Sequence, residues 1–151
     1  MKKIPGFWLL AMGLALAGFL GPLHAAPFDV ASPQITSIIA TNKGSTLTLQ
    51  MRVPPGAHVY AVHLPQGQGP MPSQVVLEPE WVVPLAQLTE SPPKRIYDQA
   101  YETTLLAHEG DFWVKVRLKQ PPHLPLRGVF RYQICSQQLC SLPQDAPFEL
   151  K

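Results

Sequence analysis

The sequence predicts an all-β domain, a sandwich of about seven to nine short strands. Its 18 prolines are spread through 151 residues, more than twice the usual share of roughly 5%, which argues against long helices. Between the prolines, apolar and polar side chains alternate, as in strands with one buried face. The length suits a single domain with one core.

The first predicted hairpin joins residues Ile35–Thr41 to Thr46–Val53 through the turn Asn42-Lys43-Gly44. In its second strand, positions 47, 49, 51 and 53 are apolar and the positions between them are polar. Because successive side chains of a strand point to opposite faces, this segment is predicted to bury one face.

The remaining strands are predicted further along the chain. Residues Phe112–Lys119 repeat the strict alternation. Less regular strands are expected at His58–His63, Gln74–Leu77, Tyr101–Ala107, Arg127–Cys135 and Pro147–Leu150. So many short strands with turn signals between them favour an immunoglobulin-like β-sandwich, with a small closed barrel as the main alternative.

The first 25 residues are predicted to be a signal peptide. Lys2 and Lys3 precede an apolar run that ends near residue 20, and small residues follow, with cleavage expected after Ala25. The domain is then residues 26–151 and is exported. An uncleaved anchor is the alternative. No cysteine stands near the cleavage site, so no lipid anchor is expected.

The charge of the exported chain excludes some partners. Removing Lys2 and Lys3 from the 12 basic residues leaves as many basic as acidic side chains, of which there are 10. A neutral domain has no electrostatic basis for binding nucleic acid or an anionic membrane.

Cys135 and Cys140 are the two cysteines of the chain. Export to an oxidising compartment predicts a disulfide between them. This disulfide closes a very short loop, and short loops gain least stability from cross-linking. Spacing alone leaves three interpretations open: a structural bridge, a pair that exchanges with other thiols, and metal binding, for which two sulfurs are too few to complete a site.

The segment Tyr132-Gln133-Ile134-Cys135 with Cys140 and Pro143, preceded by the strand Pro54-Pro55-Gly56-Ala57-His58-Val59-Tyr60, resembles a known family. It is similar to the amino-terminal periplasmic domain of DsbD-type thiol:disulfide interchange proteins. The resemblance covers essentially the whole chain after the signal. The fold it implies is an immunoglobulin-like sandwich, in agreement with the strand pattern.

The resemblance implies a carrier of two electrons in the periplasm. A membrane thiol transporter of DsbD/CcdA type would be the donor, and periplasmic thioredoxin-like or disulfide-isomerase proteins would be the acceptors. Cys135 and Cys140 would be the redox centre, without a cofactor or metal. Cys140 would form the intermolecular disulfide and Cys135 would resolve it, because the second cysteine has this role in the family.

Three further residues near the pair have expected roles. Tyr60 matches a family tyrosine close to the disulfide, where its phenol would shield the sulfurs or hydrogen-bond a thiolate; the alternative is a core tyrosine. His58 would favour thiolate if protonated, or face solvent. Tyr132 is expected on the strand face of Cys135, in the core or under the disulfide.

A cap loop covers the disulfide in the family, and residues Leu88–Arg95 are the expected equivalent. This stretch has no aromatic residue. Shielding would therefore depend on Leu88 or on the Pro92-Pro93 corner, and Glu90 would be the carboxylate that influences a thiol. The family also continues into a membrane region and a thioredoxin-like domain, whereas this chain ends at Lys151, which predicts a free shuttle.

Two other functions stay open. The sandwich could be a non-enzymatic binding or adaptor module with a structural disulfide. Alternatively, His58, His63, Met51, Met71 and the cysteines could hold Cu(I), although they are scattered through the sequence. Hydrolase chemistry has no support, because the chain has no nucleophile elbow, paired-carboxylate motif or metalloprotease pattern.

Overall fold

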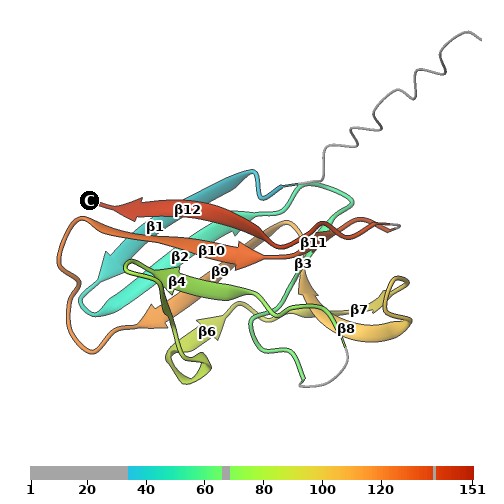
Figure 1. The fold of residues 1–151 in the computed structure, drawn as a ribbon, viewed down its shortest axis with the longest axis horizontal. Helices are drawn as coiled ribbons and strands as arrows, with labels where there is room; N and C mark the ends of the chain where they lie inside the picture. Colours follow the sequence, from blue (N-terminus) through green and yellow to red (C-terminus); the bar gives the residue numbers. More distant parts are fainter. Residues whose placement is uncertain (1–33, 66–68, 138) are drawn as a thin grey trace, which may run out of the picture. The chain divides into compact units, whose positions relative to one another are not determined.

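The computed structural model describes residues 34–65, 69–137 and 139–151 (Figure 1). The predicted signal peptide, residues 1–25, lies outside the described residues. Within those ranges, no helix has the length and apolar character that crossing a membrane would require. The secondary structure is almost entirely antiparallel strand, so the predicted all-β class is confirmed.

Two four-stranded sheets form the sandwich. One has the order β1-β2-β9-β6, from Ser37–Lys43, Thr46–Arg52, Asp111–Arg117 and Leu88–Glu90. The other has the order β12-β10-β4-β5, from Gln144–Leu150, Leu126–Tyr132, Gln74–Leu77 and Trp81–Val82. A short 3-10 helix, η1 (Leu85–Gln87), leads from β5 to β6.

The main core lies between these sheets and follows the alternation of the sequence. Leu47 and Leu49 of β2 are fully buried, as are Val114 and Val116 of β9. Leu47 lies opposite Val116 in the β2–β9 ladder, and Leu49 lies opposite Val114. Phe130 of β10 meets Phe112 of β9 with ring centroids 5.9 Å apart. Full burial of such side chains stabilises the fold by roughly 1.5–3 kcal/mol each.

A third sheet carries the cysteines. Its order is β11-β3-β8-β7, from Ile134–Cys135, His58–Tyr60, Thr103–His108 and Lys94–Asp98. These four strands lie together at one end of the ribbon in Figure 1. A second, smaller cluster packs on one face of this sheet, with Tyr60, Ala107 and Cys135 fully buried. The cysteines therefore pack against a small apolar cluster that is separate from the main core.

The described residues form twelve strands, more than predicted. The additional strands β5 and β6 have only two or three residues each, too few to show a period. The predicted strand Arg127–Cys135 is divided into β10 and β11. Strand β7 was missed because charged side chains flank its one half-buried apolar residue, Ile96. Strand β12 begins before the predicted Pro147, which is tolerated because β12 is an edge strand.

Candidate functional site

Cys135 and Cys140 form a disulfide, with an S–S distance of 2.10 Å. Cys135 ends β11, and the two residues face each other as an antiparallel bridge. Backbone hydrogen bonds close the loop on both sides, because Ser136 donates to Leu139 and Ser141 donates to Ile134. The predicted pairing is present, and its loop is anchored to the third sheet.

The two sulfurs differ in accessibility. Cys135 is fully buried in the second cluster, whereas Cys140 is half-buried. Of the two cysteines, Cys140 is therefore the residue in contact with solvent.

Tyr60 of β3 is fully buried and contacts both cysteines. Its hydroxyl oxygen lies 3.0 Å from Cys135 Sγ and 3.5 Å from Cys140 Sγ. The same hydroxyl donates to Asp98 Oδ2 over 2.6 Å. A phenol has one proton and an ionised carboxylate only accepts, so the Tyr60 proton belongs to Asp98 and the oxygen lone pairs face sulfur.

Asp98, at the end of β7, is 3% exposed and is held by four donors. Besides Tyr60 and His58, the backbone N–H groups of Ala100 and Tyr101 donate to its Oδ1. Burial alone would raise the pKa of Asp98, but the hydrogen bonds from Tyr60, Tyr101, His58 and Ala100 together lower it. Asp98 is therefore ionised at neutral pH.

The pKa of Tyr60 is raised far above its usual value. Burial is the largest cause, followed by the hydrogen bond to Asp98 and the negative charge of that carboxylate. The phenol therefore stays protonated throughout the physiological range.

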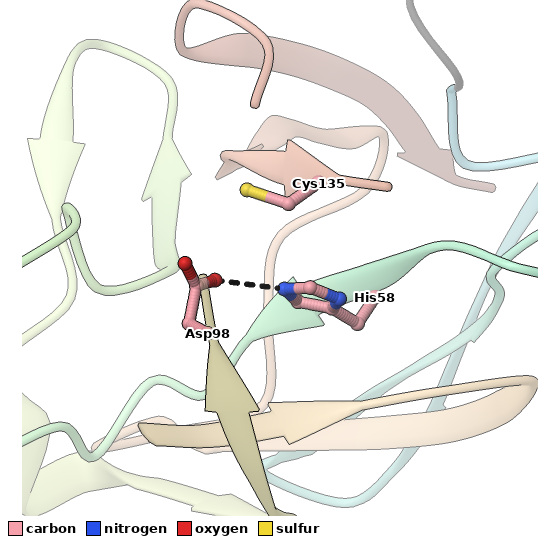
Figure 2. Close-up of side chains that lie close together, drawn as sticks. All are labelled: His58, Asp98 and Cys135. Carbon is pink, nitrogen blue, oxygen red and sulfur yellow. Dashed lines mark hydrogen bonds and ion pairs between the residues drawn. The ribbon is translucent and has the colours of Figure 1, made fainter. Parts of the chain in front are cut away.

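His58 lies directly opposite Cys135 in the β3–β11 ladder. Its Nε2 atom is 3.2 Å from Asp98 Oδ2, and its ring meets the edge of the Tyr60 ring at 5.4 Å. Figure 2 shows the imidazole and the carboxylate converging below the Cys135 sulfur, from β3, β7 and β11. His58 thus belongs to the site and does not project into solvent; its side chain is 13% exposed.

The turn after β7 lies beside the cysteine loop. A shallow pocket is lined by residues of both segments and by His58: Ile96, Tyr97, Asp98, Gln99, Ala100, Glu109, Ser136 and Gln137. From the same turn, Tyr101 meets the Tyr60 ring edge-on, with centroids 6.2 Å apart.

The comparisons agree with this architecture. Residues 28–151 match the family model described as "Thiol:disulfide interchange protein DsbD, N-terminal". The chain belongs to the DsbD N-terminal domain family. The predicted membership is therefore confirmed over the whole described region.

Two solved structures are similar to this chain. The reduced N-terminal domain of DsbD from Neisseria meningitidis has the same fold, with a TM-score of 0.54 at 16% identity, over 75% of this chain and 80% of that one. A complex of the DsbD and PilB N-terminal domains from the same organism matches with a TM-score of 0.48 at 15% identity, over 83% and 87% of the two chains. Comparison with curated proteins gives no significant match.

The structure corrects the expected cap of this DsbD-family domain. Residues Leu88–Arg95 do not line the pocket beside the cysteine loop, whereas residues 96–100 do. Leu88 is buried in the main core on β6. The acidic and aromatic side chains next to Tyr60 are instead Asp98 and Tyr101. The stretch Tyr97-Asp98-Gln99-Ala100-Tyr101, directly before a predicted strand, was the signal that could have located them.

Glu90 also has a different place. Its carboxylate is 6% exposed and accepts hydrogen bonds from the backbone N–H groups of Val62 and His63. It also pairs with His108 Nε2 at 2.7 Å and His63 Nδ1 at 3.1 Å. His108 and Tyr60 lie on opposite faces of the third sheet, because His108 pairs with Val59. Asp98, and not Glu90, is the carboxylate beside the sulfurs.

Tyr132 packs in the main core with Ile134, and Cys135 packs in the second cluster. Tyr132 ends β10 and Cys135 ends β11, two strands of different sheets, so the two side chains do not share a strand face. The predicted core position of Tyr132 is thus correct, and its predicted shared face with Cys135 is wrong. Its hydroxyl donates to Gln144 and accepts from the backbone N–H of Ile35.

Proposed function

We propose that this domain is a periplasmic dithiol/disulfide carrier. It takes two electrons from a membrane thiol transporter of DsbD/CcdA type and passes them to oxidised periplasmic proteins of thioredoxin-like or disulfide-isomerase type. Membership in the DsbD N-terminal family supports this role, as does a disulfide that lies against Tyr60, His58 and Asp98.

The observation that carries the proposal is the unequal burial of two bonded sulfurs. Cys140 is half-buried and Cys135 is fully buried. An exchange pair needs one sulfur that a partner can reach and a second that stays protected until it resolves the intermediate. A structural disulfide that never exchanges does not require this difference in burial between its two cysteines.

The transfer to an acceptor takes place in two exchange steps. The Cys140 thiolate attacks a sulfur of the acceptor disulfide, forming a mixed disulfide and releasing the other acceptor cysteine as a thiolate that takes up a proton. Cys135 loses its proton, attacks the Cys140 sulfur and releases the second acceptor thiolate. The acceptor gains two electrons and two protons, and the domain ends with the Cys135–Cys140 disulfide.

The surroundings of Cys135 favour its neutral thiol until a partner arrives. In the reduced state, the Tyr60 oxygen can accept from the Cys135 S–H, because its own proton is bonded to Asp98. The negative charge of Asp98 also opposes a second negative charge close by. This arrangement limits unproductive reaction with small disulfides in an oxidising compartment.

The redox equilibrium of the pair against glutathione tests the proposal. A carrier is expected to equilibrate measurably with the glutathione couple, whereas a potential well below about −300 mV marks a resistant structural bridge and overturns it. The roles of the cysteines are tested with Cys135→Ala and Cys140→Ala variants and a thioredoxin-like acceptor. The Cys135→Ala variant, which retains Cys140, should trap the mixed disulfide, and trapping only by Cys140→Ala would reverse the roles.

A further inference from the structure

The cysteine site brings together four groups that are typical metal ligands. One imidazole nitrogen of His58, one carboxylate oxygen of Asp98 and Cys135 Sγ all lie within 4.8 Å of one another (Figure 2). Cys140 Sγ is bonded to Cys135 Sγ at 2.10 Å and is the second sulfur of the pair. No sequence motif indicates this set, because His58 and Asp98 are 40 residues apart and meet only through the third sheet.

We propose that reduction of the disulfide creates a Zn²⁺ site with Cys135, Cys140, His58 and Asp98 as ligands. The disulfide takes up two electrons and two protons from a dithiol donor, or from a phosphine in vitro, and becomes two thiols. Zn²⁺ then replaces the two thiol protons, which are released to solvent. The oxidised protein has no thiolate and does not form the site.

The donor set favours Zn²⁺ over other ions. Zn²⁺ takes four ligands in tetrahedral geometry and accepts thiolate, imidazole and carboxylate together, at roughly 2.0–2.3 Å. Ligand atoms of such a site are roughly 3.3–3.8 Å apart, so the atoms of His58, Asp98 and Cys135, now within 4.8 Å of one another, need only small side-chain movements. The two sulfurs, 2.10 Å apart in the disulfide, separate once the bond is reduced. Cu(I) prefers purely soft donors, which a carboxylate is not.

The soft donors considered from the sequence for Cu(I) do not assemble here. Met51 is 2% exposed in the main core. His63 pairs with Glu90, on the side of the third sheet away from Tyr60. Of the two histidines in that group, only His58 lies close to Cys135 among the described residues.

The surroundings already orient the ligands. Two backbone N–H groups, of Ala100 and Tyr101, hold Asp98 Oδ1, which fixes the carboxylate plane. The Tyr60 hydroxyl bonds Oδ2 and can keep that bond while giving up its contact with sulfur. Such outer hydrogen bonds typically contribute roughly 10–100-fold to metal affinity. The pocket lined by Gln99, Ser136 and Gln137 provides an entry path.

Metal binding would couple to the redox state. An ion that binds only the reduced form stabilises it, by roughly 100-fold in the dithiol/disulfide equilibrium when free Zn²⁺ is about 100 times its dissociation constant. Bound zinc would also occupy both thiolates and stop exchange. The inference requires a reducible pair, as the proposed carrier function also does.

The test uses the full domain, reduced with a phosphine, freed of it under anaerobic conditions and assayed for two free thiols. Titration with Co²⁺ should give thiolate-to-cobalt charge-transfer bands and the intense visible bands of tetrahedral cobalt at one ion per chain. Zn²⁺ should abolish them and release two protons. The oxidised protein should show neither effect. Absence of these bands from protein with two titrated thiols overturns the inference and leaves the carrier function intact, whereas resistance to reduction overturns both.

Matched variants identify the ligands. His58→Phe keeps an aromatic ring beside Tyr60 and should weaken Zn²⁺ binding at least about tenfold, as should Asp98→Asn. His123→Phe changes an exposed histidine outside the site and should have no effect. If the first two variants bind Zn²⁺ as tightly as the wild type, the two thiolates alone hold the ion and the four-ligand site is excluded.

Discussion

The hydroxyl of Tyr60 lies 3.0 Å from Cys135 Sγ and presents lone pairs to it, not a proton. The reason is Asp98, whose carboxylate takes the phenolic proton over 2.6 Å. In the disulfide state the phenolic proton is therefore directed at Asp98, and a hydrogen bond from this phenol to a thiolate in the reduced state stays a prediction. One buried carboxylate thus fixes the direction in which the phenolic proton points.

Replacing Asp98 with asparagine should speed the reaction of the reduced protein. The carbonyl of the new side-chain amide can still accept from Ala100 and Tyr101, while its NH₂ group donates to the Tyr60 oxygen and frees the phenolic proton for a thiolate. Loss of the negative charge acts in the same direction. We expect the rate with a small aromatic disulfide at pH 7 to rise by roughly tenfold, equivalent to about 1.4 kcal/mol.

The pH profile separates this effect from simple loosening of the site. In the Asp98→Asn variant the whole rate profile should move to lower pH. Asp111→Asn removes an exposed carboxylate paired with Arg52 on the main sandwich and serves as the control, with an unchanged profile. If the Asp98→Asn variant reacts faster but its pH profile does not move, Asp98 only limits the access of the small disulfide to the cysteines.

Tyr101 should limit access to the disulfide. It packs on the edge of the Tyr60 ring and is 36% exposed, so it is placed to cover that ring from the solvent side. Tyr101→Ala should increase the rate at which a small dithiol reduces the oxidised protein. Trp81→Ala removes a comparably exposed aromatic side chain on β5 of the second sheet and should leave the rate unchanged. Equal rates in both variants and wild type would remove Tyr101 from the shielding.

The fold was predictable where single strands carry the pattern, as in residues 46–52 and 111–117, which alternate strictly. The cysteine pair and Tyr60 were predictable from a motif. Asp98 was not, because its partner Tyr60 is 38 residues away and the two meet only through the pairing of β3, β8 and β7. Such pairing depends on register between strands, which a local pattern does not contain. Without the register between strands, the sequence also wrongly predicts Glu90 beside the sulfurs.

Glu90→Gln should destabilise the fold and leave the redox chemistry unchanged. The carboxylate accepts from two backbone N–H groups and meets His108 and His63, and a glutamine would turn its NH₂ group toward donors. We expect a loss of about 2 kcal/mol in the free energy of unfolding, the cost of a buried group left without a partner. Denaturant unfolding measures the loss. A changed equilibrium with glutathione would return Glu90 to the redox site.

Acid should remove the stability that Glu90 and Asp98 contribute. Burial would raise the pKa of Glu90, but hydrogen bonds from His108, Val62 and His63 lower it, and the pKa of Asp98 is lowered as described above. A carboxyl whose pKa is lower in the folded state stabilises the fold above its unfolded pKa, near about 4, and this contribution is lost as pH falls through the folded value. The contribution of these two carboxyls to the unfolding free energy should therefore be fully present above about pH 5 and be lost below about pH 4.

The variant Glu90→Gln isolates one of these two groups. It cannot be protonated, so its stability difference from the wild type should be largest at neutral pH and shrink as the wild-type carboxylate takes up its proton. Glu78→Gln, at an exposed position, should follow the wild-type curve at every pH. Unfolding free energies measured by denaturant at several pH values give both comparisons. The stability difference between Glu90→Gln and wild type could instead stay constant down to about pH 3. Because linkage requires the folded and unfolded pKa values to differ, this result would mean that the Glu90 carboxyl has the same pKa in both states. Its contribution to stability would then come from packing and not from its charge.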